Sequence, residues 1–379
     1  FKLVQAVLAH LGRPPEEAIP YLDLVAVSIA SDIVPLHGEN RVLMREGLEV
    51  LRTSPRLGLR KLAEHARVDL PAATTHNIVF GIGPRINAAG RMGDAGRAVA
   101  LLLSQNEADA TDLAFQLEQA NHRRRTLDQD TQAEAFALAE EHLVRHPHSV
   151  VLYGPDWHPG VIGIVASRLV GRYYLPTIML TGSNGVVKGS ARSISGVNVY
   201  NLLQTCSDVL VGFGGHDHAA GVSLLEKNVS LFQRRFDEVV RDAITPELLT
   251  PEIEVDSEIE LGAIDGRFWN VLKQFAPHGP ENAQPIFHAR GLEIVGGVRP
   301  VGKEGEHLKF SIRHQEDGTY RGMEVIGFGM AEHLGTLQDS RRTGTPIEVL
   351  FNVQQNAWNG TTTLQLRAKD LKLWEERQP

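Results

Sequence analysis

The chain has 379 residues, 42% of them hydrophobic and 22% charged, which is typical of a globular protein of two or three domains, and no apolar run approaches the ~18 residues of a membrane span. The single cysteine, Cys206, excludes an intramolecular disulfide and a cysteine-rich zinc site, and favours a reducing, cytoplasmic location. The net charge of -8 argues against a general nucleic-acid coat protein but allows an enzyme with one positive groove.

Residues 1–103 are predicted to be mostly helical. The chain opens at Phe1, without an initiator methionine, in what reads as the middle of an amphipathic helix, so we expect a further segment upstream. The sequence from Gly81 to Pro84 predicts a tight loop. Helices are expected over 21–30, after Pro20 and before Pro35, and near 40–52, 57–66 and 95–104.

A long helix is predicted next. Ser104 and Glu107 fit a capping box, and neither glycine nor proline follows before Pro147. A helix of this extent spans roughly 57 Å at ~1.5 Å per residue. Its middle, 121–130, is almost wholly polar, which is typical of a helix that bridges two domains.

The rest of the chain divides into an α/β part and a β-rich part. A strand at 149–153, a helix at 161–173 and a strand at 176–180 predict a parallel strand–helix–strand unit. A strand at 186–192 and a helix at 197–206 follow. After residue 250, an alternating pattern at 253–259 and strands over 308–314, 323–328, 347–354 and 361–368 suit a small OB-like barrel, with one helix at 268–275. Asp317-Gly318 and Asn359-Gly360 are hairpin turn signals.

Asp32, at the end of an apolar helix, is the first candidate for chemistry. A carboxylate there is well held, and hard cations such as Mg²⁺ or Mn²⁺ prefer such oxygen ligands. The alternative is a helix-end aspartate that is bonded to the local backbone.

Arg91 lies in the second candidate, GPRINAAGRMGD at 83–94. Small residues let a phosphate approach closely, and a guanidinium offers it two parallel donors. Alternatively, this is a structural loop in which Arg91 pairs with Asp94.

The third and fourth candidates follow the long helix. Ser190 and Arg192, in KGSARS at 188–193, suit a phosphate cradle at a strand end, although such runs are also common on surfaces. The stretch GFGGHDHAAG at 212–221 offers the amides of Gly214 and Gly215 with His216 as a donor. A metal pair of His216 and His218, or a glycine-rich helix entry, are the alternatives there.

Some aromatic and basic residues can be interpreted either as structural residues or as contacts to a ligand. The arginines at 123–125 suit a solvated helix face better than a DNA contact. Trp157 and His158 are candidates to face a cleft. The remaining tryptophans, Trp269, Trp358 and Trp374, are either core residues or platforms for base stacking.

The order of these motifs resembles the RecJ branch of the DHH phosphoesterases. DIVPL at 32–36, followed by GENR at 38–41, is similar to the last motif of the DHH domain, and 83–92 is similar to a motif of the RecJ branch. WHPGVIG at 157–163 and GSARS at 189–193 resemble the same branch, 214–221 resembles the DHHA1 glycine motif, and FAPHGPENAQP at 275–285 resembles the start of the RecJ OB-type domain.

The resemblance implies a fold class of α/β plus all-β, in four parts. These are the C-terminal part of a DHH catalytic domain at 1–105, a linking helix at 106–146, a DHHA1 substrate-binding domain at 147–245 and an OB-fold-like DNA-binding domain at 250–379. The Asp-His-His signature of the family is absent and is expected upstream of Phe1.

The resemblance also implies a function. The family hydrolyses single-stranded DNA from the 5′ end with two divalent ions, Mn²⁺ or Mg²⁺. Asp32 would be the catalytic metal ligand, and the phosphate-binding residues would be Arg91, Ser190, Arg192, Gly214, Gly215 and His216. A single-strand-binding protein and a recombination helicase are the implied partners. The alternatives are a phosphodiesterase acting on small nucleotides and a non-catalytic replication scaffold of the same ancestry.

Overall fold

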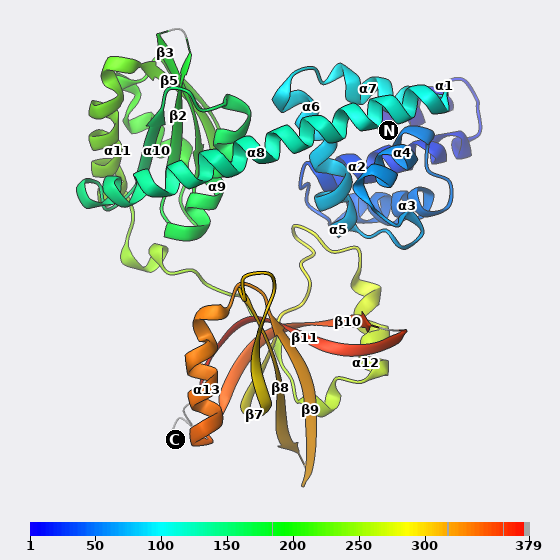
Figure 1. Ribbon diagram of the computed structural model, residues 1–379. Coiled ribbons are helices and arrows are strands. Elements are labelled where there is room, and N and C mark those ends of the chain that lie inside the picture. Colours follow the sequence, from blue (N-terminus) through cyan, green and yellow to red (C-terminus); the bar gives the residue numbers. More distant parts are fainter. Residues whose placement is uncertain (184, 317, 359, 375–379) are drawn as a thin grey trace. The chain divides into compact units, whose positions relative to one another are not determined.

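A computed structural model describes residues 1–183, 185–316, 318–358 and 360–374 (Figure 1). Its internal contacts divide the chain into two compact units. The first joins Phe1–Asp32 to Glu46–Glu252, and the second joins Ile33–Arg45 to the residues from Ile253 onward. Within the described ranges, no helix is both long enough and apolar enough to cross a membrane.

The first part of the chain is helical, as predicted. Buried leucines and alanines of α4, α6 and α7 pack against the N-terminal half of the long helix α8. The buried Asp23 on α2 is neutralised by Arg56, whose Nη2 lies 2.7 Å from the carboxylate. The helices are α1 (Lys2–His10), α2 (Leu22–Ser31), α3 (Gly38–Thr53), α4 (Leu57–Ala66), α5 (Thr75–Asn77), α6 (Gly83–Met92), α7 (Gly96–Leu103) and α8 (Glu107–Arg145).

The loop predicted at Gly81–Pro84 is wrong, because the backbone there is helical. A π-helical turn, Ile78–Ile82, runs directly into α6. A Cβ on Gly83 would lie 2.6 Å from the Ser31 Oγ, so this glycine allows α6 to approach the end of α2. Pro84 is tolerated because it occupies the first turn of α6, where its missing N–H costs no hydrogen bond.

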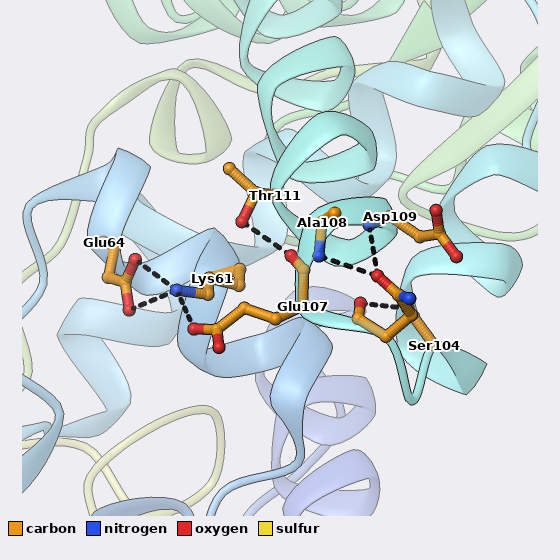
Figure 2. A network of polar contacts seen from close by, with 8 residues as sticks. Lys61, Glu64, Ser104, Glu107, Ala108, Asp109 and Thr111 are labelled. Carbon is orange, nitrogen blue, oxygen red and sulfur yellow. Dashed lines mark hydrogen bonds and ion pairs between the residues drawn. The ribbon is translucent and has the colours of Figure 1, made fainter.

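The long helix α8 has a different N-cap from the one predicted. Asn106, not Ser104, caps it, because the Asn106 side chain accepts hydrogen bonds from the backbone amides of Ala108 and Asp109 (Figure 2). Nearby, Lys61 on α4 forms an ion pair with Glu107 at 2.7 Å. The polar middle of α8 is also not uniformly solvated: Asn121, Asp128 and Thr131 are buried.

A five-stranded sheet follows α8 in the same unit. Its strands are β1 (Val150–Gly154), β2 (Thr177–Ser183), β3 (Val186–Arg192), β4 (Gly212–Gly215) and β5 (Ala219–Leu225), and its helices are α9 (Pro159–Tyr173), α10 (Val199–Thr205) and α11 (Val229–Ala243). The order is β1-β2-β3-β5-β4, and β1 and β2 are parallel. The strand–helix–strand prediction is therefore confirmed. The glycine-rich stretch at 212–221 forms the β4–β5 hairpin rather than a helix entry.

The second unit contains a closed five-stranded barrel. Its strands are β7 (Phe287–Val301), β8 (His307–Glu316), β9 (Thr319–Gly327), β10 (Ile347–Trp358) and β11 (Thr361–Leu373), with the helices α12 (Gly266–Leu272) and α13 (Leu334–Thr343). The pairing runs β7-β8-β9-β11-β10 and returns from β10 to β7, and β9 and β11 are parallel. This closure confirms the OB-like barrel.

Two details of the barrel differ from the sequence prediction. The pattern at 253–259 contributes only the short strand β6 (Ser257–Glu258), and the fifth barrel strand is the unpredicted β7. A bulge between Val295 and Arg299 interrupts the alternation of apolar and polar residues in β7, so the sequence pattern did not predict this strand. Of the two turn signals, Asp317 and Asn359 lie outside the described residues, and Gly318 and Gly360 have φ of 75° and 77°.

Candidate phosphate and metal site

Asp32 ends helix α2 and projects into solvent. Its backbone N–H donates to the Ser28 carbonyl, but its carboxylate has no hydrogen-bond or ion-pair partner among the described residues. The structure therefore does not show the alternative, in which the Asp32 carboxylate is bonded to the local backbone. The neighbouring Ser31 carbonyl accepts from Asn87 Nδ2 at 3.5 Å, so Asp32 lies beside the face of α6 that carries Asn87.

Arg91 lies one helical turn after Asn87 and meets the start of α9. Its Nη1 donates to the Gly160 carbonyl at 2.9 Å, and a Cβ on Gly160 would lie 2.5 Å from the Arg91 carbonyl oxygen. No pair between Arg91 and Asp94 forms within the described ranges, because Asp94 instead accepts from the Gly96 amide at 2.7 Å. The glycine in α9 thus allows the end of one helix to contact the beginning of another.

Arg192 approaches the same helix end from strand β3. Its Nη1 donates to the Ser190 Oγ and to the Ala191 carbonyl, both at 2.8 Å, and it has no carboxylate partner in the described part of the chain. Burial lowers the pKa of the Arg192 guanidinium, and the positive charge of Arg91 lowers it further. A Cβ on Gly163 would lie 2.8 Å from the Arg192 Nη2, so this glycine admits the side chain against α9. Two guanidiniums therefore converge where α9 begins.

Two more arginines lie nearby, Arg124 in the middle of α8 and Arg168 on α9; the sequence placed Arg124 on a solvated helix face and did not single out Arg168. Arg168 on α9 donates to Asp128 at 2.7 Å and to Gln132, while Arg124 lies 3.5 Å from the same Asp128 oxygen. Burial lowers the pKa of Arg124, although Asp128 opposes that shift, and the charge of Arg91 lowers it further. Arg124 and Arg168 thus share the buried Asp128, whereas Arg91 and Arg192 have no carboxylate partner among the described residues, and this excess of positive charge favours binding of an anion.

The β4–β5 hairpin presents the remaining candidates. Gly215 has φ of 153°, and a Cβ on it would lie 2.3 Å from the Ala219 carbonyl oxygen, so the tight hairpin requires a glycine there. Gly214 and His216 are exposed, and the imidazole lies 3.2 Å from Asp217. The hydrogen bond from His216 lowers the pKa of the Asp217 carboxyl.

The hairpin lies at the same end of the sheet as Arg192. Ser193 donates its N–H to the His218 carbonyl at 3.0 Å, and Arg192 pairs with Ala219 in the β3–β5 register. Over the described ranges, no group of three or more histidine, cysteine, aspartate or glutamate side chains could hold a metal ion. Asp32 is therefore a single candidate ligand, and the pair His216 and His218 does not form a metal site by itself.

The two residues before α9 make structural contacts. Trp157 is buried and donates its indole N–H to Glu134 at 2.8 Å. His158 caps α9 by accepting from the Gly160 amide at 3.0 Å. Both residues therefore shape the beginning of α9. Of the other tryptophans, Trp269 packs partly buried against the barrel core.

Two family models match the chain. The DHHA1 domain matches residues 147–242, and the RecJ OB domain matches residues 255–370. A helical part, a DHHA1 domain with an arginine-lined helix start, and an OB barrel together define the chain as a DHHA1-type protein that carries an OB barrel.

Relatives and solved structures narrow this class. The single-stranded-DNA-specific exonuclease RecJ of Bacillus subtilis is 34% identical over 99% of this chain and 46% of its own length, and that of Salmonella typhimurium is 33% identical over 94% and 62%. The crystal structure of RecJ in complex with Mn²⁺ from Thermus thermophilus matches with a TM-score of 0.82, at 30% identity over 98% of this chain and 52% of that one. The chain belongs to the RecJ family, and the predicted fold class is confirmed. It spans 46–62% of the length of these two curated relatives.

Proposed function

We propose that the protein is a single-stranded-DNA-specific exonuclease that hydrolyses phosphodiester bonds from the 5′ end, with divalent Mn²⁺ or Mg²⁺. The names of its RecJ relatives support this activity. The observation that carries the proposal within this chain is the convergence of Arg91 and Arg192 at the start of α9, where no carboxylate of the described residues pairs with either side chain.

This convergence suits a terminal phosphate. Arg91 and Arg192 supply charged donors, and Ser190 adds a hydroxyl. Asn87 lies four residues before Arg91 on α6, about 6 Å along the helix axis, and it contacts the residue before Asp32. A single extended nucleotide spans a distance of that order, so a strand gripped by its terminal phosphate at the arginines would present its first internal linkage near Asp32.

The metal assignment rests on Asp32. Its exposed carboxylate has no partner among the described residues and is a hard oxygen donor, which fits Mn²⁺ or Mg²⁺. Two bound ions would supply Lewis-acid activation of water and stabilisation of the leaving oxygen. Asp32 would hold one of them, and the guanidiniums would bind and orient the phosphates.

The barrel is proposed to bind the strand away from the cut. OB barrels bind oligonucleotides across the face of their second and third strands, here β8 and β9. Two exposed aromatic side chains lie there, and neither was predicted from the sequence. Tyr320 on β9 has Arg313 over its ring at 4.2 Å, and Phe328, which follows β9, has Arg367 over its ring at 5.0 Å. Aromatic rings beside arginines suit base stacking and phosphate binding.

The proposed division of labour follows the domains predicted from the sequence. Residues 1–105 would carry part of the DHH catalytic site, and 106–146 would form the helix that links it to the DHHA1 domain. The DHHA1 domain at 147–245 would bind phosphates through Ser190, Arg192, Gly214, Gly215 and His216. Residues 250–379 would bind DNA. A cytoplasmic location, a role in DNA repair and recombination, and contacts with a single-strand-binding protein and a recombination helicase belong to the same proposal.

The test uses the full-length protein and 5′-labelled oligonucleotides in Mn²⁺. We expect release of mononucleotides from single strands and not from duplexes, and loss of this activity in Asp32→Ala with DNA affinity retained. Asp69→Ala is the matched control, since Asp69 is an exposed carboxylate of the same unit. Equal cleavage of single strands by Asp32→Ala and wild type would refute the assignment. Turnover of dinucleotides but not of longer strands would instead indicate a small-nucleotide phosphodiesterase.

A further inference from the structure

The chain leaves the first unit immediately after Asp32. Helix α2 ends at Ser31, and residues from Ile33 to Arg45 make their contacts in the barrel unit. Ile33 has φ of 55°, a left-handed conformation that is a genuine outlier for a β-branched residue. Strained backbone of this kind persists only where the surrounding structure determines it, and it occurs disproportionately at functional sites.

The segment after Ile33 is held by the loop at 274–282, which precedes the barrel. Leu36 is only 1% exposed, and its N–H donates to the Pro280 carbonyl at 2.7 Å. A Cβ on Gly279 would lie 2.5 Å from the Leu36 Cδ1 and 3.0 Å from its Cγ, so a larger residue at this position would force the buried Leu36 side chain to move. The contact is therefore specific in both backbone and side chain.

Arg41 fastens the other end of the segment. Its Nη2 donates to the carbonyl oxygens of Phe275 at 2.9 Å and Gln274 at 3.3 Å. Asn282 braces the loop from within, because its Nδ2 donates to the carbonyls of Phe275 at 2.9 Å and Pro277 at 2.7 Å. The loop is thus a pre-formed receptor for the segment rather than a flexible linker.

We propose that the loop at 274–282, here called the clamp, positions the Asp32 carboxylate by fixing the backbone that follows it. Asp32 has no side-chain partner among the described residues to set its direction, so its orientation depends on α2 before it and on the clamped segment after it. Arg41, Gly279 and Asn282 are positioning residues in this scheme. The inference rests on the proposed function, in which Asp32 is a metal ligand.

The experiment measures Mn²⁺ binding to the full-length protein by electron paramagnetic resonance. Arg41→Ala removes the two carbonyl hydrogen bonds, and Gly279→Ala places a methyl group against Leu36. The matched controls are Arg342→Ala and Gly335→Ala on α13, an exposed arginine and a glycine whose added Cβ would meet nothing within 4 Å. Affinity for single-stranded DNA in EDTA and the melting temperature are recorded for every variant.

We expect both clamp variants to bind Mn²⁺ about ten- to a hundredfold more weakly, the usual consequence of losing a residue that orients a ligand. Excess Mn²⁺ should restore their turnover, and their DNA affinity in EDTA should match that of the controls. Wild-type Mn²⁺ affinity in Arg41→Ala would overturn the inference, even if Gly279→Ala fails to fold. Parallel losses of Mn²⁺ and DNA binding would overturn it too, since they indicate general damage.

Asp32→Ala separates the two proposals. If Asp32→Ala loses Mn²⁺ binding while the clamp variants keep it, the proposed function stands and the clamp inference fails. If Asp32→Ala binds Mn²⁺ as the wild type does, the proposed metal ligand itself is wrong.

Discussion

Arg192→Ala should remove the preference of the enzyme for a 5′-phosphorylated end while leaving the fold intact. The side chain is half-buried and donates only to the neutral oxygens of Ser190 and Ala191. Burial lowers the pKa of the Arg192 guanidinium, the nearby charge of Arg91 lowers it further, and no carboxylate among the described residues pairs with it. A guanidinium kept in such surroundings is suited to an anionic ligand and contributes little to the stability of the protein itself.

The magnitude follows from these contacts. A hydrogen bond to a charged group contributes about 1.5–3 kcal/mol, and ~1.4 kcal/mol is a factor of ten. Losing the contact between Arg192 and a terminal phosphate should therefore lower kcat/KM for a phosphorylated end about ten- to a hundredfold. The two hydrogen bonds from Arg192 to Ser190 and Ala191 also have a charged donor, and each contributes about 1.5–3 kcal/mol to folding. Relief from burial and from repulsion by Arg91 offsets that loss, so the melting temperature should change little.

The assay compares kcat/KM for 5′-phosphoryl and 5′-hydroxyl oligonucleotides in full-length wild type and mutant. Arg172→Ala is the matched control, because Arg172 lies near the other end of α9 and is exposed. The ratio between the two substrates should collapse in Arg192→Ala alone. An unchanged ratio would place Arg192 outside the terminal-phosphate site, and an equal loss on both substrates would indicate a structural role.

Three further outcomes are expected. Gly163→Ala should reproduce much of the Arg192→Ala effect without removing a charge, because its Cβ would lie 2.8 Å from the Arg192 Nη2; a normal 5′-phosphate preference would contradict this. Phe328→Ala should weaken binding to long single strands by about 1–3 kcal/mol, measured by fluorescence anisotropy, while Phe275→Ala, another half-exposed aromatic, should not. His142, whose pKa burial lowers to about 4, accepts from the Val151 amide. The free energy that neutral His142 contributes to folding should be complete above pH ~6.5 and should fall by at most about 3 kcal/mol as the pH drops toward 4, because the unfolded chain then binds the proton more readily. In His142→Gln the free energy of unfolding should depend less on pH over this range.

Much of the fold could be predicted because local signals and tertiary structure agree. The β1–α9–β2 unit and four barrel strands follow directly from their apolar patterns. The 15-residue strand β7 was not predicted because its bulge and its glycines interrupt the alternation of apolar and polar residues. The helix at 83–92 was taken for a loop because Gly81, Gly83 and Pro84 are breakers in isolation, whereas in the protein they permit close helix packing.

The candidate site was only partly accessible from the sequence. Arg91 and Arg192 were identified by the small residues around them, but nothing local reveals that both approach one helix end. Arg124 and Arg168 could not be recognised, because their role depends on the buried Asp128 on a helix middle that looked solvated. A polar stretch on a long helix carries two meanings, a solvated spacer or a buried network, and only the packing of a second helix decides between them.

The same limit explains why the sequence identified the segment after Asp32 as part of a family motif but not what holds it in place. Its pattern of Pro35, a buried Leu36 and a new helix reads as a turn between two helices of one domain. The contacts instead join it to the distant clamp at 274–282, through Leu36 and Arg41. Truncating the chain at residue 251 would therefore remove both the barrel and the partners of this segment. A loss of cleavage after such a truncation would not separate DNA binding from the positioning of Asp32, so single substitutions on Phe328 and Arg41 are the sharper tests of the two roles.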